Sequence, residues 1–412
     1  MTRPDRVLFA ISDTGGGHRS AAIAITAALQ MVSSREVSCE MLDVLRITNF
    51  PFVRNAPNLY DQLSTRWLPL YNLTFEVTNG IRRVDVLSRL VYLQARRNIA
   101  RALQSFNPDL VVVTHPLVYR LVRAARRTYR LSYRIVTVVT DLVTLHASWT
   151  HPDVDICLLP TDEAYTLMQR RGLSPNRMRR TGFPVHPKFA HYSQNQAESR
   201  QELGIDLDRF TVLMTSGGVG SGRMHDLVLE LERVYPETQF LVITGKNRTL
   251  QQQLLARRRS PHCHIFGFVQ NMETLMAASD IVVSKAGPGT LMEAFVMRCP
   301  VIVTEAVGAQ ERGNIDFVLN HELGFYCPTT ERIVDAISEL NNPDYYQTTI
   351  NRLAAAVPRH GAEQIAQILL EQLAQTDRPA EQRQRPRRTP LRHWRRALRR
   401  GTRQPPSSRT RP

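Results

Sequence analysis

The chain has 412 residues, with 53 Lys and Arg against 37 Asp and Glu and a formal net charge of +16. This length allows about two or three domains, each with its own core, and excludes a small scaffold held together by disulfides. Hydrophobic residues make up 42% and charged residues 22%, as is usual for a globular protein, so disorder over most of the chain is excluded as well.

The positive charge is concentrated at the C-terminal end. Residues 376–412 hold thirteen Arg against two acids, a net +11, so the preceding residues carry only +5. The first residues lack the long apolar stretch of a signal peptide, and no run of 18 or more apolar residues offers a spanning helix. We expect a cytoplasmic protein, soluble or peripherally attached to a membrane.

Short apolar runs, each followed by a segment of helical periodicity, recur along the chain, and this pattern is typical of parallel sheets covered by helices. In the first half the predicted strands are residues 7–12, 37–44, 110–115, 135–141 and 155–160, and the predicted helices are 20–32, 86–106 and 117–129. After a Gln- and Ser-rich stretch the pattern restarts, with predicted strands at 210–216, 240–245, 264–268, 281–284, 301–305 and 325–328.

This alternation predicts an α/β fold of two Rossmann-like domains that face a central cleft. We assign residues 1–190 to the first domain, 191–375 to the second, and 376–412 to a basic tail. Residues 50–82 interrupt the alternation with a stretch that has few acids and contains Phe50, Phe52, Tyr60, Trp67, Leu70, Tyr71, Leu73 and Phe75. Either they form an inserted helical pair that packs on its own domain, or they contact an acyl chain or a membrane.

Three glycine-rich segments follow predicted strands: residues 12–18 (SDTGGGH), 216–223 (SGGVGSGR) and 285–290 (KAGPGT). Glycine lets the backbone turn sharply and approach a ligand, and the following helix end offers unpaired N–H groups. Each segment alone could be a structural turn. All three, however, lie on the rim where open α/β sheets bind ligands, which favours phosphate or ribose binding.

The sequence resembles the monogalactosyldiacylglycerol synthase family, which includes bacterial diacylglycerol glucosyltransferases, over about residues 7–370. The matching motifs are SDTGGGH at 12–18, TDL at 140–142, HASW at 146–149, PTDE at 160–163, GFPVHPKF at 182–189, SKAGPGT at 284–290 and GAQERGN at 308–314. More distantly, the second half resembles the peptidoglycan N-acetylglucosaminyltransferase that acts on a lipid-linked precursor.

The resemblance implies an inverting transferase of the B-type glycosyltransferase fold, whose second domain binds a UDP-sugar without a metal or a separate cofactor. The glycine loop would take the diphosphate, a loop at Phe268 and Val269 the uracil, Glu293 the ribose, and Gln310, Glu311 and Asn314 the sugar. The donor-side residues are then Gly217, Gly218, Gly220, Gly222, Phe268, Val269, Gly287, Gly289, Thr290, Glu293, Gln310, Glu311 and Asn314. Gln310 and Glu311 could equally cap the helix that follows them.

On the acceptor side, His18 is the candidate general base, because a neutral imidazole beside a helix start can accept the hydroxyl proton. Asp13 or Asp141 could serve instead or orient the ring, and His18 could simply cap a turn. The candidate acceptor-binding residues are Gly16, Gly17, His115, His146 and Trp149. No metal site is expected from these histidines, because no pair has the helical spacing of metal ligands.

In the tail, Leu391, Trp394, Ala397 and Leu398 recur at helical spacing among arginines, as in an amphipathic helix that lies on an anionic membrane. A solvated tail or a nonspecific nucleic-acid binder remains the alternative, and no specific nucleic-acid partner is expected. The sequence indicates no oligomeric state.

The expected reaction moves a hexose, galactose before glucose, from a UDP-sugar to 1,2-diacylglycerol and makes a β-monoglycosyldiacylglycerol. One rival function is N-acetylglucosaminyl transfer to an undecaprenyl-linked peptidoglycan precursor. Another is noncatalytic binding of nucleotide sugars or polyanions. Val219 stands where the plant members of the family resemble one another in having an acidic residue, which leaves the choice of sugar open.

Overall fold

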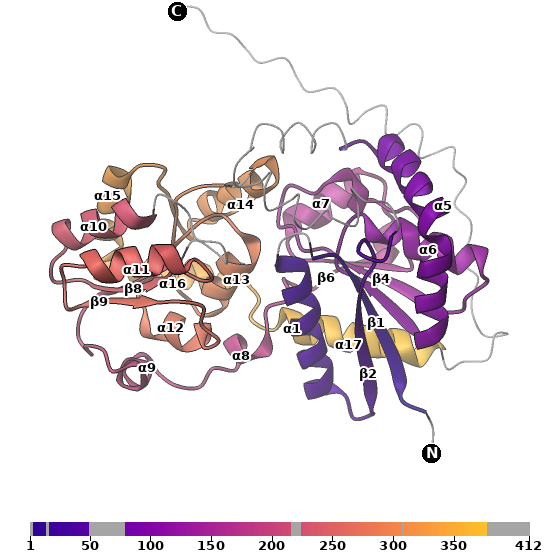
Figure 1. Ribbon diagram of the computed structural model, residues 1–412, viewed down its shortest axis with the longest axis horizontal. Coiled ribbons are helices and arrows are strands. Elements are labelled where there is room, and N and C mark those ends of the chain that lie inside the picture. The colour runs from indigo at the N-terminus through magenta and orange to yellow at the C-terminus, as the bar shows by residue number, and fades with distance from the viewer. Residues whose placement is uncertain (1–2, 14–15, 49–78, 216–223, 307, 377–412) are drawn as a thin grey trace, which may run out of the picture.

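The computed structural model describes residues 3–13, 16–48, 79–215, 224–306 and 308–376, which form two lobes that lie side by side (Figure 1). The glycine loop at 216–223, nearly all of the aromatic segment at 50–82 and the basic tail lie outside the described residues. None of the helices in the described ranges is both long and apolar enough to cross a bilayer.

The first sheet has six parallel strands in the order β2-β1-β3-β4-β5-β6. Its strands are β1 (Asp5–Ile11), β2 (Val37–Asp43), β3 (Leu110–Val113), β4 (Arg134–Val138), β5 (Ile156–Leu159) and β6 (Met178–Arg180). Its helices are α1 (Gly17–Val32), α5 (Ile81–Phe106), α6 (Val118–Thr128), η1 (Ala147–Trp149), α7 (Asp162–Arg170) and η2 (Pro175–Arg177). Five strands lie where the sequence predicts them, and β6 is an addition at the edge.

The second sheet is also parallel and six-stranded, in the order β12-β11-β10-β7-β8-β9. Its strands are β7 (Thr211–Thr215), β8 (Gln239–Ile243), β9 (Cys263–Phe266), β10 (Ile281–Ser284), β11 (Val301–Val303) and β12 (Gly324–Tyr326). The remaining helices are α8 (Pro187–Ala190), α9 (Gln196–Leu203), α10 (Met224–Val234), α11 (Arg248–Arg257), α12 (Met272–Ala278), α13 (Pro288–Val296), α14 (Gly308–Asn320), α15 (Thr330–Leu340), α16 (Pro343–Ala356) and α17 (Gly361–Thr376). All six strands overlap the predicted ones.

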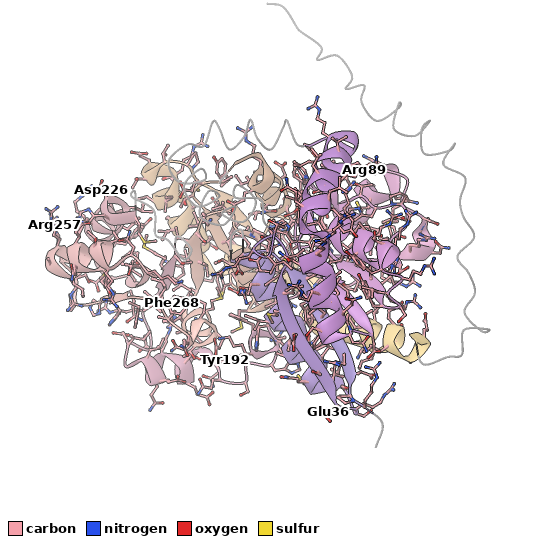
Figure 2. The ribbon with its side chains drawn as sticks, turned by 45° about the vertical axis from the view of Figure 1, so that its right-hand side comes forward. Glu36, Arg89, Tyr192, Asp226, Arg257 and Phe268 are labelled. Atoms are coloured by element: carbon pink, nitrogen blue, oxygen red, sulfur yellow. The ribbon has the colours of Figure 1, made fainter. Side chains whose placement is uncertain are left out.

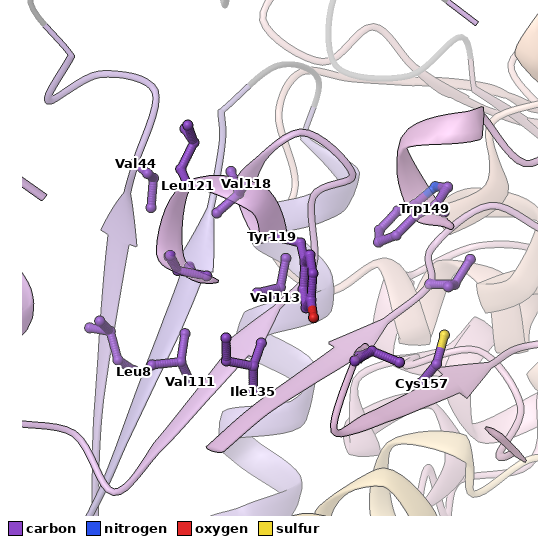
Figure 3. Packing of buried hydrophobic residues seen from close by; sticks show 14 of the residues in the cluster. Leu8, Val44, Val111, Val113, Val118, Tyr119, Leu121, Ile135, Trp149 and Cys157 are labelled. Atoms are coloured by element: carbon purple, nitrogen blue, oxygen red, sulfur yellow. The ribbon is translucent and has the colours of Figure 1, made fainter. Parts of the chain in front are cut away.

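The central strands are apolar without interruption because helices cover both faces of the sheet. In β3 (LVVV), Val111 and Val113 pack on one face with Tyr119 of α6, whereas Val112 packs on the other. Figure 3 shows Tyr119 of α6 over Val113 and Ile135. Successive strand residues therefore fill two separate cores, and the run has no polar face to expose.

Helix α17 belongs to the first domain, so the expected boundary of the second domain at residue 375 is wrong at its C-terminal end. Its apolar face, from Ala362 to Leu373, shares one buried cluster with Phe9 and Val112. The helix lies beside α1 along the first sheet (Figure 1). The chain thus crosses between the domains twice, near residue 182 and near residue 361.

The two crossings touch each other at glycines. Gly182 has a φ of +82°, and a Cβ there would lie 3.3 Å from Cβ of Pro358. A Cβ on Gly361 would lie only 2.4 Å from the carbonyl oxygen of Phe183. The backbone therefore needs glycine at both positions to bring the two crossings together.

Candidate active site

The order of the first sheet reverses between β1 and β3, and the carboxyl edge at such a reversal is where open α/β sheets bind ligands. His18 is the second residue of α1, directly after the glycine segment that follows β1. Its ring meets the ring of His115, which follows β3, edge to face at a centroid distance of 4.6 Å. Thr140, just after β4, completes the group.

The His18 ring is held by Thr140 and kept neutral by its surroundings. Nδ1 of His18 lies 3.0 Å from Oγ1 of Thr140. Burial lowers the pKa of His18 to about 4, and it lowers the pKa of His115 as well. A neutral His18 was expected from the helix start, and the structure shows that desolvation is the larger cause.

Asp13 and Asp141, expected either to serve as the base instead of His18 or to orient its ring, each have a close partner other than His18. Both oxygens of Asp13 accept from Arg19, at 2.6 Å and 2.9 Å, and this salt bridge lowers the pKa of Asp13. Asp141 accepts from the indole N–H of Trp149 at 2.5 Å. The oxygen that lies 3.0 Å from Nδ1 of His18 belongs to Thr140, which the sequence did not single out, although it precedes Asp141 in a quoted motif.

The other predicted acceptor-side residues divide into open and buried positions. Gly16 and Gly17 are exposed, and a Cβ on either would meet no atom within 4 Å, so a ligand has room there. Trp149 is only 1% exposed and packs in the first core, so almost none of its surface is open to an acceptor (Figure 3). His146 is buried as well and caps η1 by accepting from the N–H of Ser148.

In the second domain the strand order reverses between β7 and β10. Of the predicted donor residues, Gly287, Gly289, Thr290 and Glu293 follow β10, Phe268 and Val269 follow β9, and Gln310, Glu311 and Asn314 follow β11. The loop after β10 leads through Gly287 into α13, which begins at Pro288. Gly289 lies in the first turn, with open space at its Cβ position, and Thr290 follows it. Glu293 lies one turn further, and burial raises the pKa of Glu293 to about 7. Lys188, from the first crossing, pairs with Glu273 at 2.6 Å and partly offsets that shift.

The residues expected to contact the sugar lie at the start of α14, against the loop after β10. Nζ of Lys285 is 3.7 Å from Oε1 of Glu311, and the same Oε1 lies 4.0 Å from a Cβ position on Gly287. Asn314 donates from Nδ2 to the carbonyl of Ala286 at 2.8 Å, so it fastens α14 to this loop.

The structure describes only some of the other residues expected to bind the donor. Gly217, Gly218, Gly220 and Gly222 and the side chain of Gln310 lie outside what the structure describes. Phe268 is 65% exposed, and Nζ of Lys246 lies 5.9 Å from its ring centre (Figure 2). Val269 is partly buried and packs on the second core. The exposed ring therefore offers a flat surface beside a cation, at the carboxyl edge of the second sheet.

Helix α14 of the second domain contacts residues of the first domain at two points. Nε2 of His321, at the end of α14, lies 2.8 Å from Oε1 of Glu163 on α7. A Cβ on Gly313 of α14 would lie 2.4 Å from Oγ1 and 2.8 Å from the backbone nitrogen of Thr144. The sugar-side helix of the second domain thus touches the loop that leaves β4 in the first.

We expect the Gly313→Ala variant to lose about tenfold or more in kcat/KM. The added methyl group must push α14 away from Thr144, and displacements of about 1 Å can cost about 100-fold in rate. Asp316→Ala, an exposed change on the same helix, is the control. Equal activity of both variants would show that this contact does not set the geometry of the cleft.

Among the described residues, the side-chain types that bind metals gather in one group of three, His191, His360 and Glu363, near the crossings. Oε1 of Glu363 lies 2.7 Å from Nε2 of His191 and 3.2 Å from Nδ1 of His360. These hydrogen bonds account for the group, which does not include the residues of the two carboxyl edges.

Comparisons with known proteins identify the family. Residues 18–185 match the sequence profile of monogalactosyldiacylglycerol (MGDG) synthase, and residues 211–367 match the C-terminal domain of glycosyltransferase family 28. The chain is 32% identical to the chloroplastic MGDG synthase of Spinacia oleracea, over 82% of this chain and 67% of the spinach protein. The chain belongs to the monogalactosyldiacylglycerol synthase family. A probable MGDG synthase of Glycine max is also 32% identical, over 86% and 69% of the two chains.

Solved structures support the fold expected for an MGDG synthase relative. The calicheamicin glycosyltransferase CalG4 aligns with a TM-score of 0.60 at 12% identity, over 92% of this chain and all of that one. MurG of Acinetobacter baumannii aligns with a TM-score of 0.55 at 12% identity, over 89% of this chain and all of that one. The expected B-type glycosyltransferase fold is confirmed, and so is the resemblance to the family.

Proposed function

We propose that the protein transfers a hexose, galactose before glucose, from a UDP-sugar to the free hydroxyl of 1,2-diacylglycerol and forms a β-linked monoglycosyldiacylglycerol. The observation that carries this proposal is a neutral histidine at the carboxyl edge of one sheet, in a cleft whose other side holds the Glu311–Lys285 pair. Membership in a family whose plant relatives are named MGDG synthases supplies the substrate class.

In this proposal His18 takes the proton from the attacking hydroxyl through Nε2. The neutral ring then carries its hydrogen on Nδ1, where it donates to Oγ1 of Thr140 at 3.0 Å. Oγ1 of Thr140 lies 3.5 Å from the carbonyl oxygen of Thr114, which can receive the hydroxyl hydrogen. These two hydrogen bonds, from His18 to Thr140 and from Thr140 to Thr114, would fix the tautomer that leaves a lone pair on Nε2, as a general base requires. In this proposal Asp141 does not contact the attacking hydroxyl; it accepts a hydrogen bond from the indole N–H of Trp149.

The donor is held by the second domain. Backbone N–H groups of Gly217, Gly218, Gly220 and Gly222 would bind the diphosphate, which needs no metal. Phe268 and Val269 would contact the uracil, Glu293 the ribose hydroxyls, and Gln310 and Glu311 the sugar. Asn314 supports this site through its bond to Ala286. Nζ of Lys285 lies 3.7 Å from Oε1 of Glu311. In this proposal its positive charge would stabilise the departing phosphates.

The enzyme would work at a membrane surface, because its acceptor is a lipid. The basic tail at 376–412 is one proposed attachment, through its arginines and Trp394. Removal of the tail should weaken binding to anionic vesicles and reduce the dependence of binding on salt. Equal binding by the full chain and the shortened chain would reject this role for the tail.

The affinity for uridine should rise as the pH rises from about 5.5 to about 7 and level off above that. The pKa of Glu293 is raised to about 7. The ionised carboxylate accepts hydrogen bonds from the two ribose hydroxyls more strongly than the protonated acid does. A proton must therefore leave Glu293 on binding below pH 7, which costs up to about tenfold in affinity per pH unit. Calorimetry with uridine, which has no phosphate to titrate, measures this directly. In Glu293→Gln the dependence should vanish; if it persists, another group is responsible.

Incubation of the purified full chain with diacylglycerol vesicles and a panel of UDP-sugars tests the proposed function. We expect a product with the mass of a monohexosyldiacylglycerol, formed fastest from UDP-galactose. UDP-N-acetylglucosamine should give none. Turnover with no UDP-sugar, or transfer only of N-acetylglucosamine, would contradict the proposal.

A further inference from the structure

The first crossing between the domains ends in α8, which lies between the two lobes (Figure 1). This helix contacts α1 of the first domain and α13 of the second. Phe189 of α8 shares the second core with Leu291 and Phe295 of α13. His186 caps α8 by accepting from the N–H of Lys188 at 3.2 Å. The backbone of Lys188 is therefore fixed against α13, the helix that carries Glu293.

The ammonium group of Lys188 is held by two contacts with the second domain. Nζ lies 2.6 Å from Oε2 of Glu273 on α12, and it donates to the carbonyl oxygen of Gln270 at 2.7 Å. The side chain of Glu273 is only 17% exposed, and that of Lys188 is 36% exposed. Charges that are partly buried are screened less by salt and water than surface charges are. A cation of the crossing thus has a defined place in the second domain.

Two charged groups act on Glu293, and they act in opposite directions. The positive charge of Lys188 lowers the pKa of Glu293, and the negative charge of Glu273 raises it. The other elements in contact with α13 are α1 and β10. β10 (IVVS) has no charged residue, and the titratable residues of α1 are the neutral His18 and Arg19, which is held in a salt bridge. Within the described ranges, Lys188 is thus the cation that favours the ionised form of Glu293.

We propose that Lys188 is a positioning residue for the nucleotide, whose ammonium group stabilises the negative charge with which Glu293 holds the ribose. Nucleotide binding by the second domain then depends on a cation that the segment joining the two domains supplies. Lys188 itself does not touch the nucleotide in this account. The inference rests on the proposed function, in which Glu293 binds the ribose hydroxyls.

A purely mechanical role of Lys188 makes a different prediction. Its contacts with Glu273 and Gln270 also fasten α8 to the start of α12. If fastening were the whole role, loss of either partner of the ion pair would weaken nucleotide binding to the same extent at every pH. Because Lys188 and Glu273 carry opposite charges, an electrostatic role requires that their removal shift the pH dependence in opposite directions.

The test is calorimetry of uridine binding to the full chain between about pH 5.5 and about pH 9. In Lys188→Met the pKa of Glu293 should rise, so the affinity at about pH 6 should fall about threefold or more and should match the wild type again at about pH 9. In Glu273→Gln the pKa should fall, so the affinity at about pH 6 should increase. Arg352→Met, which breaks a pair with Glu322 elsewhere in the second domain, is the matched control and should leave the pH dependence unchanged.

Two results would overturn the inference. One is an affinity that changes in the same direction in Lys188→Met and Glu273→Gln, and the other is a pH dependence that neither variant alters. NMR titration of the labelled carboxyl carbon of Glu293, assigned with Glu293→Gln, repeats the test without nucleotide and should show the same opposite shifts. Absence of uridine binding by the wild type would contradict the proposed donor site, and the NMR titration would then decide the inference by itself.

Discussion

Replacement of His18 by alanine should lower kcat by about 10²–10⁴-fold, the usual contribution of a general base. The affinity for UDP should be unchanged, because His18 belongs to the first domain and the nucleotide is held by the second. The pKa of His18 is lowered to about 4, so the ring stays in its accepting form from neutral pH down to about 5. Acidification to that point should therefore not slow the wild type through this group.

Thr140→Val is the companion variant for His18. It keeps the shape of the side chain but removes the oxygen that lies 3.0 Å from Nδ1 of the ring. If Thr140 fixes the tautomer, kcat should fall by a smaller factor than in His18→Ala while KM for the acceptor stays the same. Single-turnover rates for both variants report the chemical step directly. Full turnover by His18→Ala would falsify the assignment of the base.

Replacement of Gly361 by alanine is expected to lower the free energy of unfolding by about 1–3 kcal/mol and to reduce activity. Its Cβ would lie 2.4 Å from the carbonyl oxygen of Phe183 and 3.0 Å from the carbonyl carbon of Gly182, and backbone atoms cannot swing aside as a side chain can. Relief requires the two interdomain crossings to separate. That movement shifts the start of α17, which covers the first sheet.

His360→Ala is the matched control for Gly361→Ala, because it changes the neighbouring residue, whose ring is exposed. It removes a hydrogen bond to Glu363 and leaves the contact between the crossings intact. Urea denaturation of both variants, followed by fluorescence, gives the two free energies. Equal stability of Gly361→Ala and the wild type would mean that the crossings are not pressed together in solution.

Much of the fold could be predicted, because strands that are buried on both faces appear in the sequence as short, continuous apolar runs. Strand β6 (Met178–Arg180) was missed because it is a three-residue edge strand with two exposed arginines. Helix α17 lies almost entirely within residues 191–375, which the sequence analysis assigns to the second domain, but it packs on the first sheet. Its apolar positions suit either sheet, and only the second crossing at Gly361 determines which sheet it covers.

The candidate site could be predicted as a set of segments but not as a set of contacts. Glycine turns after β1 and β10 lie at the carboxyl edges, as the sequence indicates. The partners of Asp13, Asp141 and Trp149 could not be read from spacing, because each depends on how a loop folds back. The burial that keeps His18 neutral also could not be predicted, because it depends on how the segments that follow β1, β3 and β4 pack together.

The central claim is that one cleft brings a UDP-hexose and diacylglycerol together for direct displacement at the anomeric carbon. The most direct measurement is the anomeric configuration, by NMR, of the lipid that the full chain makes from UDP-galactose and diacylglycerol vesicles. A direct displacement predicts a β-galactosyl linkage from the α-linked donor. An α-linked product, or no galactolipid at all, would contradict the account.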